Sequence, residues 1–233
     1  MGVIENNLRN TAISLSILSL ILVGYLYVVN EKYKKYKYKY KSYEKIIPII
    51  DSQLHRLCHR TRDYTTCLRA AENAQETENY AESAIKNALI SASNTFAELT
   101  GVTCTSSMML IQKDGSLKTT LYCPNVDPQR ESRPSGNLST DSGIAGEALS
   151  TGNVVSWSSG DTKFKQTRND FAEYYNSGIC IPFKSGFEYL GLLNIDSLET
   201  NKFNDKKHRE IAATFGDSIA LILEIKNLWL EKK

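Results

Sequence analysis

Five cysteines and one close pair of histidines are the side chains in this sequence best suited to metal or redox chemistry. The cysteines are Cys58, Cys67, Cys104, Cys123 and Cys180. Their number is odd, no two form a CxxC pair, and no Cys/His cluster has the spacing of a metal site. We interpret them as free thiols in a reducing compartment, with a redox or metal role as the alternative.

The two histidines, His55 and His59, lie four residues apart with Cys58 between them. On a helix this spacing puts both imidazoles on one face, where they can share a metal ion. No acidic or third ligand is evident beside them. We therefore interpret the pair as surface or helix-seam residues, and we expect no metal site.

A third set of residues could bind a small molecule. Arg130 and Arg133 lie on a proline-containing loop, and their guanidinium groups could hold an anion through bidentate contacts. Five aromatic side chains further along the chain could wall a cavity and stack on a ring: Trp157, Phe164, Phe171, Tyr174 and Tyr175. The alternative is that the aromatic residues are core and the arginines solvated. As a group, these seven residues are the predicted ligand site.

The elements that would position this site include two predicted β-hairpins. Their strand candidates are residues 103–111 with 117–123, and residues 179–183 with 189–195. The Asp114-Gly115 pair between the first two is a strong hairpin signal. The second pair is apolar throughout and predicts a well-buried hairpin, in which Pro182 indicates an edge position or a bulge.

The other elements complete an α+β fold, and the composition of 41% hydrophobic and 23% charged residues is that of a globular chain. They are a short helix over 140–151, a short strand over 154–157 and a long amphipathic helix over 204–230. With a helix before residue 100, an antiparallel sheet with its first and last helices on one face satisfies this order. Loops and the small helix would cover the other face and leave a pocket beneath them.

An uncharged stretch near the start of the chain predicts a membrane anchor. Residues 10–30 carry no charge and are long enough to span a hydrocarbon core of about 30 Å. A cleaved signal peptide is the alternative, but the preceding residues are weakly charged, the apolar run is long and no A-x-A site follows. We predict a retained transmembrane helix.

A Lys/Tyr-rich segment, residues 31–45, follows this span directly. Residues 1–45 hold eight basic and three acidic residues, a net charge of +5 in a chain whose total is +2. The positive-inside rule then predicts a single-pass protein of the cell inner membrane with its C-terminal domain in the cytoplasm. The lysines expected to contact membrane lipids are Lys32, Lys34, Lys35, Lys37, Lys39 and Lys41. Because basic character is confined to this segment, we expect no nucleic-acid binding.

Residues 51–99 lack Gly and Pro and have apolar residues at alternating spacings of four and three, which predicts a coiled-coil stalk and a homodimer. Gln75, Glu78 and Glu82 interrupt this seam, so one long helix and two helices with a break near 73–80 both remain open. The predicted organisation is a short extracytoplasmic N-terminus (1–9), the transmembrane helix (10–30), a juxtamembrane segment (31–50), the stalk (51–99) and a sensor domain (100–230).

Residues 85–225 resemble a GAF domain, the small-molecule sensor module of signalling proteins. Four stretches carry the resemblance, in the order and at the spacing of the family: SGIAGEALSTG at 142–152; NVV at 153–155 followed by Asp161 and Phe164; the hairpin 179–183 with 190–196; and the final helix at 203–223. The resemblance implies a GAF/PAS-like antiparallel sheet with a ligand pocket.

The sequence motifs that identify particular GAF subtypes are missing from residues 85–225. Where the cyclic-nucleotide form has Asp-Glu after its Phe, Phe171 is followed by Tyr175-Asn176. Bilin attachment and haem ligation need a histidine, and the only one in the domain is His208. Free methionine sulfoxide reductases use pocket cysteines, whereas the three cysteines of this domain lie on predicted strands.

We therefore predict a membrane-anchored GAF-type sensor that binds a small molecule or a partner protein, signals through helix rearrangement and acts on a signalling partner in trans. No catalytic constellation is present, so we expect no enzymatic activity, and no cofactor beyond an unknown small-molecule ligand. The alternative is a membrane effector whose GAF-like domain reads a nucleotide signal and whose transmembrane helices cluster to disturb the bilayer.

Overall fold

The computed structural model describes residues 47–123, 138–141, 143–160 and 175–231. The chain divides into two units, Met1–Pro48 and Ile49–Lys233, and the architecture below is that of the second unit. Within the described ranges, no helix combines the length and the apolar character needed to cross a membrane. The predicted transmembrane helix and the Lys/Tyr-rich segment lie outside these ranges.

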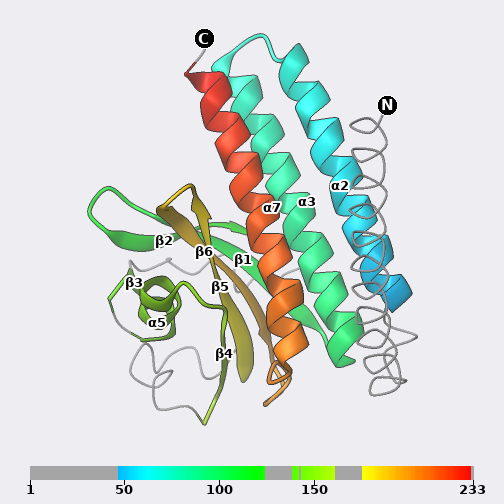
Figure 1. Cartoon of the computed structure of the whole chain (residues 1–233), viewed down its shortest axis with the longest axis vertical. Coiled ribbons are helices and arrows are strands. Elements are labelled where there is room, and N and C mark those ends of the chain that lie inside the picture. Colours follow the sequence, from blue (N-terminus) through cyan, green and yellow to red (C-terminus); the bar gives the residue numbers. More distant parts are fainter. Residues whose placement is uncertain (1–46, 124–137, 142, 161–174, 232–233) are drawn as a thin grey trace, which may run out of the picture. The chain divides into compact units, whose positions relative to one another are not determined.

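A six-stranded antiparallel sheet forms the centre of the domain (Figure 1). Its strands are β1 (Cys104–Ile111), β2 (Ser116–Tyr122), β3 (Leu138–Ser139), β4 (Val155–Ser158), β5 (Ser177–Ser185) and β6 (Glu188–Ser197). They are arranged in the order β3-β2-β1-β6-β5-β4, so β1 and β6 are central. Both predicted hairpins are confirmed, as β1–β2 and β5–β6.

The turn residues of the first hairpin and Pro182 of the second are each compatible with the backbone at their position. Gly115 has φ 78°, which a side chain would disfavour, and the backbone N–H of Ser116 donates to Asp114 Oδ1 at 2.9 Å. β4 pairs with β5 only over residues 177–180. Among the described residues, Pro182 therefore has a partner strand on one side only, and the missing N–H is tolerated there.

Among the described residues, four helices accompany the sheet: α2 (Ile47–Ala70), α3 (Ala74–Thr100), α5 (Gly143–Thr151) and α7 (Lys206–Leu230). The predicted stalk is two helices, because the chain leaves helical geometry after Ala70. Asn73 then caps α3 by accepting from the backbone N–H of Glu76. At the other end of the domain, Asp205 caps α7 by accepting from the backbone N–H of Lys207.

α3 and α7 lie together on one face of the sheet and α5 lies on the other, as the sequence predicted (Figure 1). α3 contacts β1, α7 contacts β5, and the two helices contact each other. Gly216 allows α7 to lie close to β5, because a Cβ atom there would lie 2.8 Å from Ile181 Cγ2. The second helix of the predicted stalk therefore belongs to the same hydrophobic core as the sheet.

Side chains alternate between the two faces along each strand, and each face has its own core cluster. Met108, Ile181 and Leu193 belong to the cluster with α3 and α7. Their chain neighbours Met109, Cys180 and Leu192 belong to the cluster with α5. This alternation decides which polar side chains of β1 and β6 meet on the α5 face.

Candidate functional site

Four polar side chains form a patch on the α5 face of the two central strands. Thr105 and Ser107 come from β1, and Asn194 and Asp196 come from β6. Thr105 lies directly opposite Asp196, and Ser107 directly opposite Asn194. Directly opposed residues share a face with Cβ atoms about 5 Å apart, so the four side chains are neighbours. We call this patch the polar floor.

The side chains of the polar floor are largely shielded from solvent, although polar side chains are costly to bury without partners. Ser107 is 4% and Asp196 6% exposed, and Thr105 and Asn194 are half-buried. Within the described part of the chain, the side chains of Ser107 and Asn194 make no hydrogen bond. In the described part of the chain, the fully buried side-chain atoms without a hydrogen-bond partner are the Tyr64 hydroxyl and His208 Nδ1. The polar atoms of Ser107 and Asn194 are therefore open to water or to a ligand.

The neighbouring serine, Ser106, points to the other face and shows the contrast. Its hydroxyl donates to the backbone oxygen of Leu89 at 2.8 Å and accepts from Ser93 Oγ at 2.9 Å. Ser106 is therefore a structural residue that ties β1 to α3. The adjacent Ser107 has no such role within the described structure.

Asp196 dominates the electrostatics of the polar floor. Burial raises the pKa of the Cys180 thiol, and the charge of Asp196 raises it further. Burial also raises the pKa of Cys104 to about 11; Thr100, a hydrogen-bond partner, lowers it and Asp196 raises it. Both thiols are therefore neutral near pH 7, and the negative charge that acts on them is that of the Asp196 carboxyl group.

Trp157 closes one side of the polar floor. Trp157 on β4, Gly178 on β5 and Asp196 on β6 are directly opposed residues in one row across the sheet. A Cβ atom on Gly178 would lie 2.7 Å from both Asp196 Oδ1 and Trp157 Nε1. The indole edge and the carboxylate thus converge over the glycine, and only a residue without a side chain leaves them that space.

A pocket of about 390 Å³ adjoins Trp157 at the end of β4. Its lining residues are Ser156, Trp157, Ser158, Ser159, Gly160, Thr200, Asn201 and Asn204. Apart from the indole and the glycine, these side chains carry hydroxyl or amide groups, and none is charged. The pocket can therefore form hydrogen bonds with a polar molecule without favouring either sign of charge.

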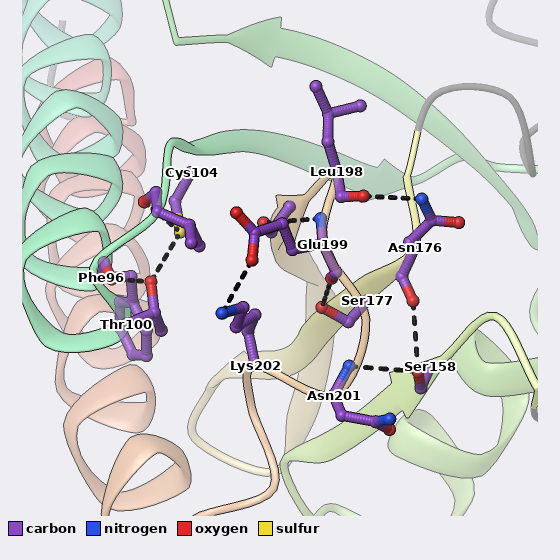
Figure 2. A network of polar contacts seen from close by, with 12 residues as sticks. Phe96, Thr100, Cys104, Ser158, Asn176, Ser177, Leu198, Glu199, Asn201 and Lys202 are labelled. Carbon is purple, nitrogen blue, oxygen red and sulfur yellow. Dashed lines mark hydrogen bonds and ion pairs between the residues drawn. The ribbon is translucent and has the colours of Figure 1, made fainter.

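A hydrogen-bond network fixes the wall of this pocket (Figure 2). Ser158 Oγ donates to the backbone oxygen of Asn176 at 3.2 Å and accepts from the N–H of Asn201 at 3.3 Å. The amide of Asn176 donates to the backbone oxygen of Leu198 at 2.6 Å. Asn201 itself has φ 58°, a left-handed conformation that asparagine tolerates. The loop after β6 is thereby joined to β4 and β5.

The predicted site residues are described only in part. Trp157 and Tyr175 are each 8% exposed and belong to the core cluster on the α5 face, alongside Met109 and Ile144. Arg130, Arg133, Phe164, Phe171 and Tyr174 lie outside the described residues, as do the six lysines expected at the membrane. The structure therefore brings Trp157 and Tyr175 into one cluster beside the polar floor.

Sequence reasoning missed the polar floor itself. The signal was present as polar residues two apart, at 105 and 107 in one strand and at 194 and 196 in the other. From sequence, residues 189–195 are predicted as a buried apolar run and residues 103–111 as a hairpin strand. The pairing register that brings the four residues together cannot be read from either strand alone.

All five cysteines are free: Cys58 and Cys67 are exposed on α2, and Cys104, Cys123 and Cys180 are buried. Cys104 and Cys180 lie on strands, as expected, and Cys123 directly follows β2.

No family model matches the chain, and no curated protein matches it. Among solved structures, it is similar to the GAF domain of the phosphoenolpyruvate-protein phosphotransferase of Acinetobacter, with 13% identity over 76% of this chain and 95% of that chain, and a TM-score of 0.51. The corresponding domain from Coxiella burnetii has 16% identity over 74% of this chain and 95% of that chain, with a TM-score of 0.49. The predicted GAF-like α+β fold is confirmed by the first of these similarities.

The prediction that the chain is not an enzyme is corrected by the same comparison. Similar solved structures include the type II free methionine-R-sulfoxide reductase of Thermoplasma acidophilum, with 14% identity over 62% of this chain and 95% of that chain, and a TM-score of 0.46. The expectation that the chain has no enzymatic activity is therefore withdrawn. Identity at this level assigns no activity to the chain either.

Proposed function

We propose that this chain is a GAF-type sensor whose polar floor and adjoining pocket bind a small molecule. One observation carries the proposal: the Ser107 hydroxyl and the Asn194 amide face each other at the centre of the sheet, beside the buried Asp196 and without a hydrogen bond of their own. A domain that needed only to fold would have gained stability from apolar residues at these positions. A bound polar molecule explains their presence.

The charge and geometry of the floor favour a ligand that donates hydrogen bonds. Ionised Asp196 can only accept, whereas the side chains of Ser107 and Asn194 can both donate and accept. A ligand with an N–H or ammonium group facing Asp196 would satisfy this set, and the indole of Trp157 offers a flat apolar wall beside it. An anionic group would have to lie away from Asp196, where Arg130 and Arg133 remain our predicted partners for it.

The route from the floor to the helices is short. On β1, Ser107 faces the floor while Met108 faces the cluster with α3 and α7. On β6, Asn194 faces the floor while Leu193 and Ile195 face that cluster. A ligand that shifts β1 relative to β6 would change how α3 and α7 pack on the sheet. Ligand binding would then favour one arrangement of the helices over another, as expected of a sensor. We propose that the chain is anchored in the membrane by its N-terminal segment and forms a homodimer. The movement of the helices would then be transmitted to a signalling partner in trans.

Native mass spectrometry of the full chain, purified from cells in detergent, tests the proposal. The wild-type protein should retain a small molecule that Ser107→Ala and Asn194→Ala lose, and neither substitution should lower the free energy of unfolding by more than about 0.5 kcal/mol. Ser106→Ala is the matched control. It removes a hydroxyl bonded to Leu89, so it should cost about 1 kcal/mol or more and leave the retained molecule in place. Retention unchanged by Ser107→Ala and Asn194→Ala would contradict the proposal.

A further inference from the structure

The histidine pair on α2 has a geometry that the sequence spacing alone does not give. The Nε2 atoms of His55 and His59 lie 3.0 Å apart, and the two ring centroids are 4.5 Å apart at 74°. Both side chains are exposed. The two imidazoles therefore converge through the same ring atom on the solvent side of the helix.

This separation is the one that two ligands of a single metal ion require. Imidazole nitrogens bind first-row metals at about 2.0–2.1 Å, and two such nitrogens about 90° apart lie about 3.0 Å from each other. In a tetrahedral site the same two nitrogens would be about 3.4 Å apart. The observed distance is that of a hydrogen bond between the rings, and it places both nitrogens within reach of one metal ion. Among divalent first-row ions, Cu²⁺ and Ni²⁺ bind nitrogen ligands strongly and accept tetragonal geometry.

We propose that His55 and His59 form a two-nitrogen chelate for a divalent transition-metal ion of the Ni²⁺ and Cu²⁺ class, with water in the remaining positions. One helical turn between the ligands keeps both imidazoles on one face, as in helical H-x3-H metal sites. The hydrogen bond between the imidazoles is replaced by two metal–nitrogen bonds. The ring whose Nε2 carried the proton changes tautomer, so that its proton lies on Nδ1 and both ligating imidazoles are neutral.

The surroundings of the pair contain charges of both signs. Asp51 lies four residues before His55 and Asp63 four residues after His59, so two carboxylates continue the same spacing. Within residues 47–123, 138–141, 143–160 and 175–231, no group of three or more His, Cys, Asp or Glu side chains is placed to hold a metal ion. The site as built thus has two protein ligands, and a carboxylate joins only if its side chain rotates. Arg56, Arg60 and Arg62 are also exposed near the pair and weaken cation binding through repulsion.

A positional swap provides a matched control. His59→Arg with Arg60→His keeps the composition, charge and number of histidines but places the imidazoles five residues apart, on different faces of the helix. NiCl₂ is titrated calorimetrically into the full chain in detergent at pH 7.5. The wild-type chain should bind one Ni²⁺ per chain, and the swap should bind at least about tenfold more weakly. His55→Gln should lose as much, and circular dichroism checks that both variants keep their helix content.

Three outcomes would overturn the proposal. Equal Ni²⁺ affinity in the wild-type chain and the swap would exclude the chelate. Loss of binding in Cys58→Ser equal to that in the swap would identify the neighbouring thiol as a required ligand. In a Cys58→Ser/Cys67→Ser background, Cu²⁺ should give an electron paramagnetic resonance spectrum with hyperfine coupling to two equivalent nitrogens, and a spectrum with one nitrogen would also overturn it. His208, the third histidine of the chain, is retained throughout as the single-imidazole background.

Discussion

Trp157 Nε1 and Asp196 Oδ1 converge over Gly178, so that a Cβ atom on the glycine would lie 2.7 Å from each. The three residues belong to adjacent strands and one cross-strand row. The sheet therefore places an aromatic edge and a buried carboxylate against each other at the border of the polar floor, and the glycine between them makes the approach possible.

The first prediction tests this contact. Gly178→Ala should lower the free energy of unfolding by about 1–3 kcal/mol, because the new methyl group must displace the indole or the carboxylate. Urea unfolding followed by tryptophan fluorescence measures the loss. Gly160→Ala is the control, since a Cβ atom there meets nothing within 4 Å. Equal stability of the two variants would show that the indole and the carboxylate move aside without cost.

The fold was largely predictable because its signals are local. The Asp114-Gly115 turn and the spacing of apolar residues along α7 each depend on neighbours within a few positions of the chain. Pro182 was anticipated at an edge or a bulge, and it lies beyond the end of the β4–β5 pairing. The break at Asn73 was one of two open alternatives, because capping by a single asparagine competes with helix propensity on both sides.

The site was predictable only where residue type carried the signal. Trp157 and Tyr175 were chosen as aromatic residues and do lie together in one cluster. Ser107 and Asn194 are residue types that occur in many strands. They are notable here because they lie directly opposite each other and their side chains form no hydrogen bond within the described structure. That relationship depends on strand register between segments more than 80 residues apart, and a single strand does not encode it.

The second prediction concerns the thiols. In the native chain two of the five cysteines, Cys58 and Cys67, should react rapidly with a disulfide reagent at pH 8, because they are exposed on α2. Cys104 and Cys180 should react only on unfolding, because burial raises the pKa of both thiols and keeps the reactive thiolate scarce. Absorbance after addition of the reagent, with and without guanidinium, counts both classes. Rapid reaction of Cys180 would mean that the α5 face opens readily.

The third prediction concerns pH. Burial lowers the pKa of His208 below its ordinary value of 6.5, although Asp205 and a hydrogen bond with the Lys202 backbone oppose the shift. His208 packs beside Phe96 and Phe203, with ring centroids 5.9 and 6.4 Å away. Because the folded chain then binds fewer protons than the unfolded chain, this contribution to stability is complete above pH 6.5 and is lost as the pH falls through the folded pKa.

Urea unfolding at pH 7.5 and pH 5.5 measures this dependence. The wild-type chain should lose more stability between the two values than His208→Gln, which cannot titrate at this position. The comparison at pH 7.5 separates the packing cost of the substitution from its effect on protonation. An equal loss in both chains would mean that other groups carry the whole pH dependence.

The fourth prediction concerns the junction of α2 with the domain core. The ring of Tyr64 is buried in the cluster with α3 and α7, and its hydroxyl has no hydrogen-bond partner within the described structure. Burial raises the pKa of this hydroxyl, and so does the charge of Glu78, which pairs with Lys226 of α7 at 3.2 Å. The ring therefore stabilises the junction while the desolvated hydroxyl opposes it.

Tyr64→Phe should accordingly leave the free energy of unfolding unchanged or raise it by up to about 1 kcal/mol, because it removes an unsatisfied polar group and keeps the ring. Tyr64→Ala should lower it by about 3–5 kcal/mol, because it leaves a cavity between α2 and the core. Both values come from urea unfolding of the full chain in detergent. If Tyr64→Phe costs more than about 1 kcal/mol, the hydroxyl has a partner, and α2 is held to the domain by a polar contact as well as by packing.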